Sequence, residues 1–291
     1  MRLANPQSAS QKLPQIPAPM KLVSLHIYPV KGCRGLSLRQ ASVDAFGLQG
    51  DRRFLVVDEN GRFLTQRTHP RMALIETALT AGTLILSAAG SGNIEVPLVD
   101  PAATLRPVEI WGDKGLQAED CGKASADWLG SVLGARCGLV RIGAAFHRPV
   151  RPDKASPGDV VMFADAYPFL VLSEATLDAL NDRLEAQDQS AVPMNRFRPN
   201  FVLSGAAPHA EDTWTRFSLG SVLFRAAGPC ARCIVTTTDQ LTGERGKEPL
   251  RTLASYRRNP VDPTRIDFGQ NLIHETKSGS VQVGDDVVVI A

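Results

Sequence analysis

The sequence lacks several features that would assign it to a specialised class of protein. Its longest apolar runs are much shorter than the roughly 20 residues of a membrane-spanning helix, so no membrane span is expected. The net charge of the 291 residues is only +2, so the bulk charge does not indicate a nucleic-acid partner. Residues 1–20 have no continuous apolar core, which excludes a secretory signal, and their Pro, Gln and Ser content predicts a disordered leader.

Cysteine is also scarce, with five residues: Cys33, Cys121, Cys137, Cys230 and Cys233. An odd number of thiols without a secretory signal favours a reducing compartment, and we therefore expect a cytoplasmic protein with thiols free or on metal. No cysteine follows Cys233, so the chain lacks the cysteine set for an iron–sulfur cluster of its own.

What the sequence does contain is a dense series of short strand patterns separated by turn residues. A hydrophobic content of 43% and a charged content of 21% are typical of a globular protein with a sizeable core. Alternation and turn signals predict strands at 21–30, 36–43, 52–58, 62–67, 74–79, 83–87, 94–98, 108–111, 139–142, 201–203, 214–217, 222–224, 234–238, 268–275 and 281–290. Helical spacing predicts helices at 120–133, 173–184 and 250–258, the second capped by Ser173.

The stretch 222–239 is the chemically most suggestive one, because it contains Cys-Ala-Arg-Cys at 230–233 between two apolar or β-branched runs. A thioredoxin-like redox pair is disfavoured, since the β-branched run after Cys233 is poor helix material. A structural zinc site would need further ligands, but there is no second C-x-x-C and the five histidines are scattered. Two interpretations remain, small buried residues or one thiolate on a redox-active metal, and spacing alone favours the first.

Eight segments together resemble one family, and they occur in that family's order across nearly all of 21–291. They are YPVKGCRG at 28–35, GDRRFLVVD at 50–58, PFLVLSEATLDALNDRL at 168–184, RFRPNFVLSG at 196–205, CARCIVTTTD at 230–239, KEPLRTLASYR at 247–257, FGQN at 268–271 and VGDDVVVI at 283–290. The chain resembles the proteins with a molybdenum-cofactor sulfurase C-terminal (MOSC) domain and an N-terminal β-barrel companion, and among them the amidoxime-reducing proteins. The resemblance implies a mostly β (α+β) fold, with a barrel-like N-terminal domain at 21–145, a MOSC β-barrel domain at 146–291 and a few helices.

The resemblance also implies a molybdenum cofactor (Mo-molybdopterin) and a set of residues that bind it. Cys233 would be the metal ligand and catalytic residue, with Cys230 as a packing neighbour. The remaining cofactor-binding positions would be Lys31, Gly32, Arg52, Asp165, Ala166, Tyr167, Arg198, Asn200, Ala231, Arg232 and Asn271. Cations and backbone N–H groups at strand ends suit a phosphate, and Asp or Asn side chains suit the edge of a pterin. Two positions depart from the family: relatives commonly have Ser where this chain has Gly32, and the mitochondrial protein has Tyr where this chain has Asn271. Asp51, in a Gly-Asp turn, is expected to have a structural role.

The activity implied by the resemblance is reduction of N-hydroxylated or N-oxygenated compounds, such as amidoximes, hydroxylamines and N-hydroxylated bases. Because the chain has no cluster cysteines, the electrons would come from a separate donor protein, a ferredoxin or a flavin/haem reductase system. One alternative is a cofactor carrier or sulfur-handling protein that holds a persulfide on Cys233. Another is a binding module without chemistry.

Overall fold

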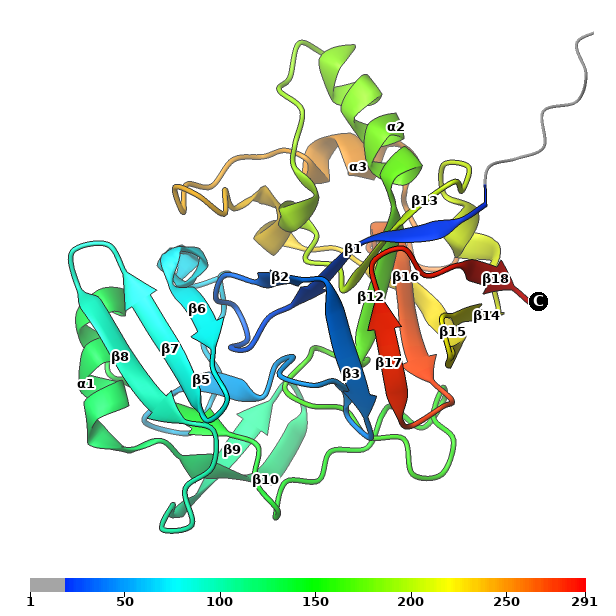
Figure 1. Cartoon of the computed structure of the whole chain (residues 1–291). Helices are drawn as coiled ribbons and strands as arrows, with labels where there is room; N and C mark the ends of the chain where they lie inside the picture. The colour runs from blue at the N-terminus through cyan, green and yellow to red at the C-terminus, as the bar shows by residue number, and fades with distance from the viewer. Residues whose placement is uncertain (1–18) are drawn as a thin grey trace, which may run out of the picture.

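The computed structural model describes residues 19–291, so most of the leader predicted at 1–20 lies outside the described residues. Its largest sheet has eight strands in the order β18–β14–β15–β16–β12–β13–β1–β2, and every pair is antiparallel except the parallel pair β12–β13 (Figure 1). These strands are β18 (Val287–Val289), β14 (Arg216–Leu219), β15 (Val222–Ala231), β16 (Asp267–His274), β12 (Phe169–Ser173), β13 (Phe201–Ser204), β1 (Lys21–Ile27) and β2 (Leu36–Leu38).

The eight-stranded sheet curls so strongly that its two sides meet. The amide of Leu22 in β1 donates to Asp285 O at 2.9 Å, and the amide of Gly284 donates to Leu22 O at 2.8 Å. These bonds, with a single bridge between Lys21 and Asp286, join the sides at one place and do not form the continuous ladder of a closed barrel. The first two strands of the chain therefore complete a sheet whose other strands all come from residues 169–289.

Three smaller sheets complete the β structure. One has the order β5–β11–β10–β9, the second β6–β7–β8, and the third β17–β3–β4, in which β17 comes from the end of the chain. Their bounds are β3 (Gln40–Asp44), β4 (Gly47–Leu48), β5 (Phe54–Asp58), β6 (Glu76–Leu79), β7 (Thr83–Ala88), β8 (Gly92–Pro97), β9 (Leu105–Ile110), β10 (Asp113–Asp120), β11 (Cys137–Arg141) and β17 (Gly279–Gln282). Since β17 pairs with β3, segments near the two ends of the chain contact each other at two places, here and at the hydrogen bonds between Leu22 and residues 284–285.

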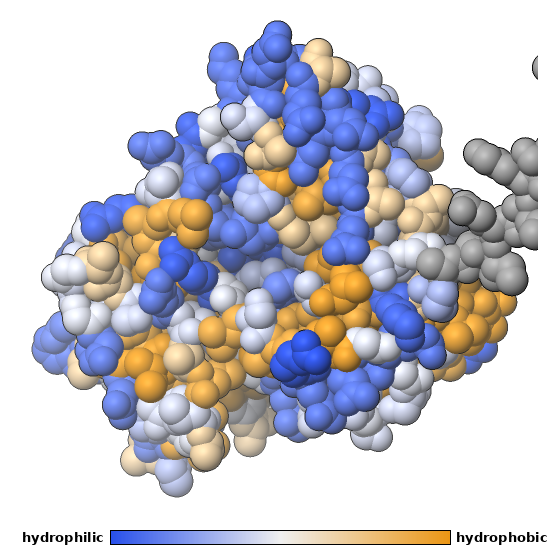
Figure 2. All heavy atoms as spheres, turned by 45° about the horizontal axis from the view of Figure 1, so that its top comes forward, coloured by the Kyte–Doolittle hydropathy of each residue, from blue (hydrophilic) through white to orange (hydrophobic). Residues whose placement is uncertain are grey.

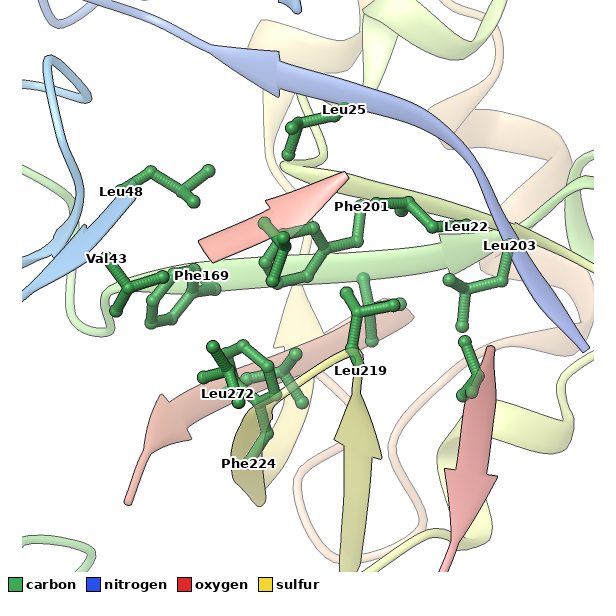
Figure 3. Packing of buried hydrophobic residues seen from close by; sticks show 14 of the residues in the cluster. Leu22, Leu25, Val43, Leu48, Phe169, Phe201, Leu203, Leu219, Phe224 and Leu272 are labelled. Atoms are coloured by element: carbon green, nitrogen blue, oxygen red, sulfur yellow. The ribbon is translucent and has the colours of Figure 1, made fainter. Parts of the chain in front are cut away.

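A cluster of aromatic rings fills the inside of the curled sheet (Figure 3). The rings of Phe169 and Phe201 stack with centroids 5.5 Å apart, and Phe224 meets each of them edge-on at 5.1 and 5.4 Å. All three side chains are buried, and each contributes about 1.5–3 kcal/mol through its transfer from water. Phe169 and Phe201 start β12 and β13, so this core fixes the strand ends that lead into the cleft described below.

The helices are short and cover the sheets from outside. They are α1 (Gly122–Leu133), α2 (Glu174–Glu185) and α3 (Leu250–Tyr256), with 3₁₀ turns η1 (Pro70–Leu74), η2 (Met194–Arg196), η3 (Ala210–Thr213) and η4 (Ile234–Thr237). Ser173 caps α2, as expected, by accepting the amide of Thr176 at 3.1 Å. None of these helices is both long and apolar enough to cross a membrane. On the face in Figure 2, hydrophobic residues form separate patches among polar ones.

Several expected elements differ in the structure. The strand expected at 234–238 is the 3₁₀ turn η4, because the hydroxyls of Thr236 and Thr237 donate to carbonyls three residues back at 3.0 and 2.8 Å. The strand expected at 62–67 is reduced to isolated bridges. The strand expected at 36–43 is divided into β2 and β3, and β10 was not expected at all. Conversely, β15 extends beyond 222–224 through Gly228 and Pro229 with two irregularities of register against β16.

Candidate active-site cleft

All twelve site residues expected from the sequence line one cleft of about 680 Å³. They come from the loop after β1, the turn before β5, the loop before β12, the residues before β13, the end of β15 and the middle of β16. They are Lys31, Gly32, Arg52, Asp165, Ala166, Tyr167, Arg198, Asn200, Ala231, Arg232, Cys233 and Asn271. Segments separated by up to 240 residues in the sequence, from Lys31 to Asn271, therefore share one concave surface.

Lys31 and Asp165 form an ion pair across the cleft. Burial lowers the pKa of Lys31, and the neighbouring carboxylate opposes that change. For Asp165, desolvation in the cleft disfavours ionisation, but the Lys31 ammonium, with smaller contributions from Arg52 and Arg67, outweighs it and lowers the pKa of the carboxyl to about 2. The pair therefore holds a charged Asp165, with 68% of its side chain exposed, at a fixed place on the wall.

Gly32 occupies a backbone conformation and a space that suit glycine. Its φ of 87° lies in the left-handed region, and a Cβ built on it would lie 2.9 Å from Met72 Cε. A serine here would be strained and would have to displace the Met72 side chain. The Gly32 carbonyl accepts from Gln66 Nε2 at 2.7 Å, so the loop is held by a side chain that the sequence did not single out.

Asp51 is the fully buried centre of a hydrogen-bonded cluster with Tyr28, Arg52 and Asn200, which we name the Asp51 hub. Its carboxylate accepts from the Tyr28 amide at 2.7 Å, from Arg52 NH1 at 2.6 Å and from Asn200 Nδ2 at 3.1 Å. Asn200 Oδ1 in turn accepts from Arg52 NH1 at 3.1 Å and from the Leu170 amide at 3.2 Å. Asn200 is thus committed to protein partners, and Asp51 has the structural character expected from the sequence.

The Tyr28 ring lies between two guanidinium groups. Arg52 Cζ is 4.5 Å and Arg198 Cζ is 4.2 Å from its centroid, and the hydroxyl donates to Pro199 O at 3.0 Å. Burial raises the pKa of Tyr28 to about 12, although both guanidinium groups lower it, so the ring remains neutral. Both arginines have positive φ, 46° and 56°, which is strained for a residue with a side chain. The backbone strain therefore coincides with the cationic part of the cleft.

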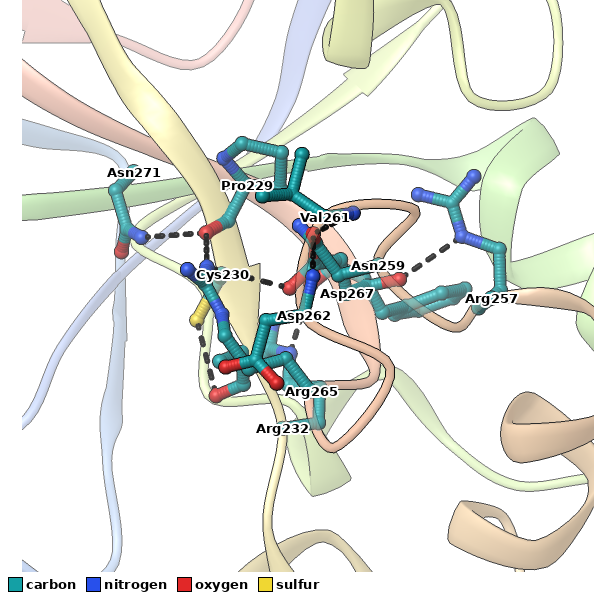
Figure 4. A network of polar contacts seen from close by, with 12 residues as sticks. Pro229, Cys230, Arg232, Arg257, Asn259, Val261, Asp262, Arg265, Asp267 and Asn271 are labelled. Carbon is teal, nitrogen blue, oxygen red and sulfur yellow. Dashed lines mark hydrogen bonds and ion pairs between the residues drawn. The ribbon is translucent and has the colours of Figure 1, made fainter.

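The end of β15 contributes the sulfur side of the cleft (Figure 4). Arg232 Nε donates to Phe268 O at 2.7 Å and NH1 donates to Phe197 O at 3.0 Å, while NH2 is buried without a partner among the described residues. Burial raises the pKa of the Cys230 thiol, and Asn271 Nδ2 donates to Pro229 O at 3.3 Å. Cys233 follows in extended backbone at the start of η4 and is partly exposed to the cleft.

The cleft is strongly cationic. Nine of its lining side chains are basic and two are carboxylates: Lys31, Arg52, Arg67, Arg151, Lys154, Arg196, Arg198, Arg232 and Arg265 against Asp153 and Asp165. Four of the bases make ion pairs, namely Lys31, Arg52, Arg196 and Arg265. The other five have no carboxylate partner within residues 19–291.

Unpaired guanidinium groups and the buried, unpartnered NH2 of Arg232 fit an anionic cofactor such as a pterin phosphate. Residues 19–291 contain no group of three or more His, Cys, Asp or Glu side chains that would bind a metal ion. A metal here would accordingly need most of its ligands from a cofactor, which agrees with a single thiolate at Cys233.

The sequence did not single out several residues that line the cleft or support it. Tyr28 lies inside a segment that carried the resemblance, but its role depends on the three-dimensional packing of two arginines. Phe63, Arg67 and Trp111 form an outer wall of the cleft. They belong to none of the matching segments, and no chemical motif links residues separated by more than forty positions.

Comparison with known proteins agrees with the resemblance. Residues 19–136 match the family described as the MOSC N-terminal beta barrel domain, and residues 158–288 match the MOSC domain. The human protein named mitochondrial amidoxime-reducing component 1 is 38% identical over 287 residues, covering 92% of this chain and 82% of that protein. The bovine mitochondrial amidoxime reducing component 2 is 34% identical, covering 90% and 81%. The molybdenum cofactor sulfurase of Danio rerio is 32% identical, covering 92% of this chain but 34% of that protein.

Proposed function

This chain belongs to the family of MOSC-domain proteins that includes the amidoxime-reducing components, and from this premise we propose how its cleft works. It is a molybdenum-cofactor-dependent oxidoreductase that reduces N-hydroxylated compounds to the corresponding amine form. The overall reaction is R–NHOH + 2e⁻ + 2H⁺ → R–NH₂ + H₂O. The observation that carries the assignment of roles is that the cationic residues and the two thiols converge on one cleft.

The bound cofactor would supply the two-electron chemistry, and the chain would supply its ligand, its orientation and the surrounding field. We assign the metal to the Cys233 thiolate, because Cys233 is partly exposed to the cleft next to Arg232. Burial raises the pKa of Cys230, which favours its neutral thiol and makes it the poorer ligand.

The cations would be divided between direct binding and support. Arg198 and Arg232 have no carboxylate partner in the described chain, and Lys31 reaches the same cleft, so we assign these three to the negative charge of the cofactor. Asp165 and Asn271 both line the cleft and would offer an acceptor and a donor for the edge of the pterin. Gly32, Ala166, Tyr167 and Ala231 would contribute backbone groups or contact.

Arg52 and Asn200 form the more rigid part of this arrangement. Both are hydrogen-bonded to Asp51, and Arg52 NH2 also donates to Arg198 O at 3.3 Å. We infer that Asn200 is a positioning residue, because its amide oxygen and nitrogen both bond within the protein. It keeps Arg52 at the wall of the cleft, where Arg52 and Arg198 stack on Tyr28.

Electrons would arrive from a separate carrier, and we propose a ferredoxin or a flavin/haem reductase system in the cytoplasm. The support is chemical: the five cysteines are free thiols, and no group of three metal-binding side chains exists in residues 19–291. Purified protein given NADH alone is expected to reduce no hydroxylamine, whereas addition of a crude cytosolic fraction should restore turnover. Full activity with NADH alone would refute the need for a separate donor.

The assay for the function is benzamidoxime reduction by protein produced with molybdate and supplied with an artificial electron donor. We expect benzamidine to accumulate with the wild type and with Cys230→Ser, and to be lost in Cys233→Ser. Cys230→Ser is the matched control, since it removes a thiol three residues away, near the end of β15. An active Cys233→Ser variant would contradict the assignment of Cys233 as the metal ligand. It would also argue against a persulfide role for Cys233.

A further inference from the structure

The outer wall of the cleft has a composition that cofactor binding does not account for. Phe63 and Trp111 lie edge to face with centroids 4.9 Å apart, and Arg67 Cζ lies 4.5 Å from the Trp111 ring centroid. Lys31 Nζ lies 5.3 Å from the Phe63 centroid. The wall, defined as Phe63, Arg67 and Trp111, therefore runs outward from the cofactor-side cation Lys31 to the exposed rim.

Trp111 occupies a backbone position that does not suit it. It is the first of the two turn residues between β9 and β10, followed by Gly112, and its φ is 54°. Hairpin turns with a positive φ at that position usually place glycine or asparagine there. A large aromatic residue in such a position is an outlier, and Trp111 is both 37% exposed and one of the residues that line the cleft.

Arg67 is held in place through its backbone and not through an ion pair. Its amide donates to Thr65 Oγ1 at 2.8 Å, and its carbonyl accepts from Arg245 NH2 at 3.0 Å. The guanidinium has no carboxylate partner within residues 19–291, and the two nearby cleft cations Arg151 and Lys154 have none either. The wall therefore presents a guanidinium that makes no ion pair in the described chain and lies over an indole ring.

We propose that this wall is a substrate-recognition subsite for planar aromatic N-hydroxy compounds that carry an anionic substituent, a carboxylate or a phosphate. An aromatic ring finds a stacking surface in the Trp111–Arg67 pair, and the anionic substituent meets the free N–H groups of Arg67. The N–OH end then points inward along Phe63 to the part of the cleft that holds Cys233. This inference rests on the proposed function and adds the substrate class to it.

The kinetic test uses two matched substrate pairs that differ in one anionic group: benzamidoxime against 4-carboxybenzamidoxime, and N⁴-hydroxycytidine against its 5′-monophosphate. We expect about tenfold higher kcat/KM for the anionic member of at least one pair in the wild type. Arg67→Gln should remove that preference, so that the two members of the pair have equal kcat/KM, while Arg67→Lys should restore part of it. Arg62→Gln, an exposed neighbour outside the cleft, is the control and should behave as the wild type.

The pair that shows the preference identifies the anion as carboxylate or phosphate. Equal kcat/KM within both pairs, or a preference that survives Arg67→Gln, would overturn the proposal. If no substrate in either pair turns over, the proposed function fails. The proposed subsite can still be tested by binding, which does not require turnover. Calorimetric titration should show 4-carboxybenzamide binding about tenfold tighter than benzamide, with the difference lost in Arg67→Gln.

Trp111→Gly tests ligand recognition by the indole without disturbing the fold, because glycine suits the positive φ of the turn. We expect its Tm to stay within about 2 °C of the wild type, since relief of strain offsets the lost contact with Phe63. Binding of both benzamide ligands should weaken in this variant. Unchanged binding of both would overturn the stacking part of the proposal.

Discussion

The Asp51 hub provides the most demanding prediction for the architecture of the cleft. Asp51 is fully buried and accepts three hydrogen bonds, from a backbone amide, a guanidinium and a side-chain amide. In Asp51→Asn the shape is kept, but the charge is lost and the new NH₂ group faces at least one of these donors. Arg52, whose side chain is only 13% exposed, then has no carboxylate partner.

Breaking a buried ion pair in this way costs about 3–5 kcal/mol. With an unfolding entropy of about 2.1 cal/mol/K per residue, a 291-residue chain has about 0.6 kcal/mol/K, so the expected fall in Tm is about 5–8 °C. Differential scanning calorimetry measures it directly. We also expect less bound molybdenum per protein, because Arg52 and Asn200 lose their common anchor.

Asp286→Asn is the matched control for this prediction. It removes the same charge from an ion pair with Lys21 at 2.7 Å, in which the side chains are 44% and 68% exposed. Such a surface pair contributes about 0–1 kcal/mol, so its Tm should fall by less than about 2 °C. If the two variants lose the same Tm, the hub does not have the stabilising role that its burial and hydrogen bonds indicate.

Three further predictions concern individual residues. Burial lowers the pKa of His274 to about 4, so the imidazole is neutral in the folded state. Because the unfolded state, with a pKa of about 6.5, takes up the proton first, the free energy of unfolding is fully maintained above about pH 6.5 and decreases as the pH falls towards 4. Urea unfolding between pH 7.5 and 4.5 should therefore be less pH-dependent in His274→Gln, and an unchanged slope would contradict this. Lys31→Met should raise the pKa of Asp165 from about 2 towards its usual value, because the ammonium and its hydrogen bond are lost while Arg52 and Arg67 still favour the carboxylate, and a carboxyl NMR titration that still shows about 2 would disprove the pairing. Gly32→Ala should cost more stability in calorimetry than Gly115→Ala, since both have positive φ but only the first meets Met72; equal costs would show that the contact is unimportant.

The helices and the cleft show which parts of the structure local sequence encodes. The helix at 174–185 was predictable because its cap Ser173 and its leucine spacing act within a few residues. The turn η4 was not, since the β-branched run after Cys233 favours a strand until its threonine hydroxyls bond back to the main chain. The pairing of β1 with β13 joins residues about 180 positions apart, and nothing in the sequence of either strand specifies that partner.

The candidate site was predictable for a different reason. Nine of its twelve residues lie in segments that match a family, and the other three, Asp165, Ala166 and Tyr167, directly precede one of these segments. The structure brings all twelve to one cleft, although their individual roles stay a proposal. Arg67 and Trp111 lie outside those segments, and their contact depends on how the β9–β10 turn meets the loop before η1. The residues proposed to bind the cofactor are therefore visible in or beside sequence motifs, whereas the wall proposed to select a substrate becomes visible only in the folded chain.

The most direct test of the central claim is the molybdenum and pterin content of purified protein produced with molybdate. Inductively coupled plasma mass spectrometry should find close to one molybdenum per chain in the wild type and in Cys230→Ser. Cys233→Ser should retain little metal while keeping the Tm of the cofactor-free wild type. Stoichiometric molybdenum in Cys233→Ser, or a wild type without molybdenum, would contradict the account.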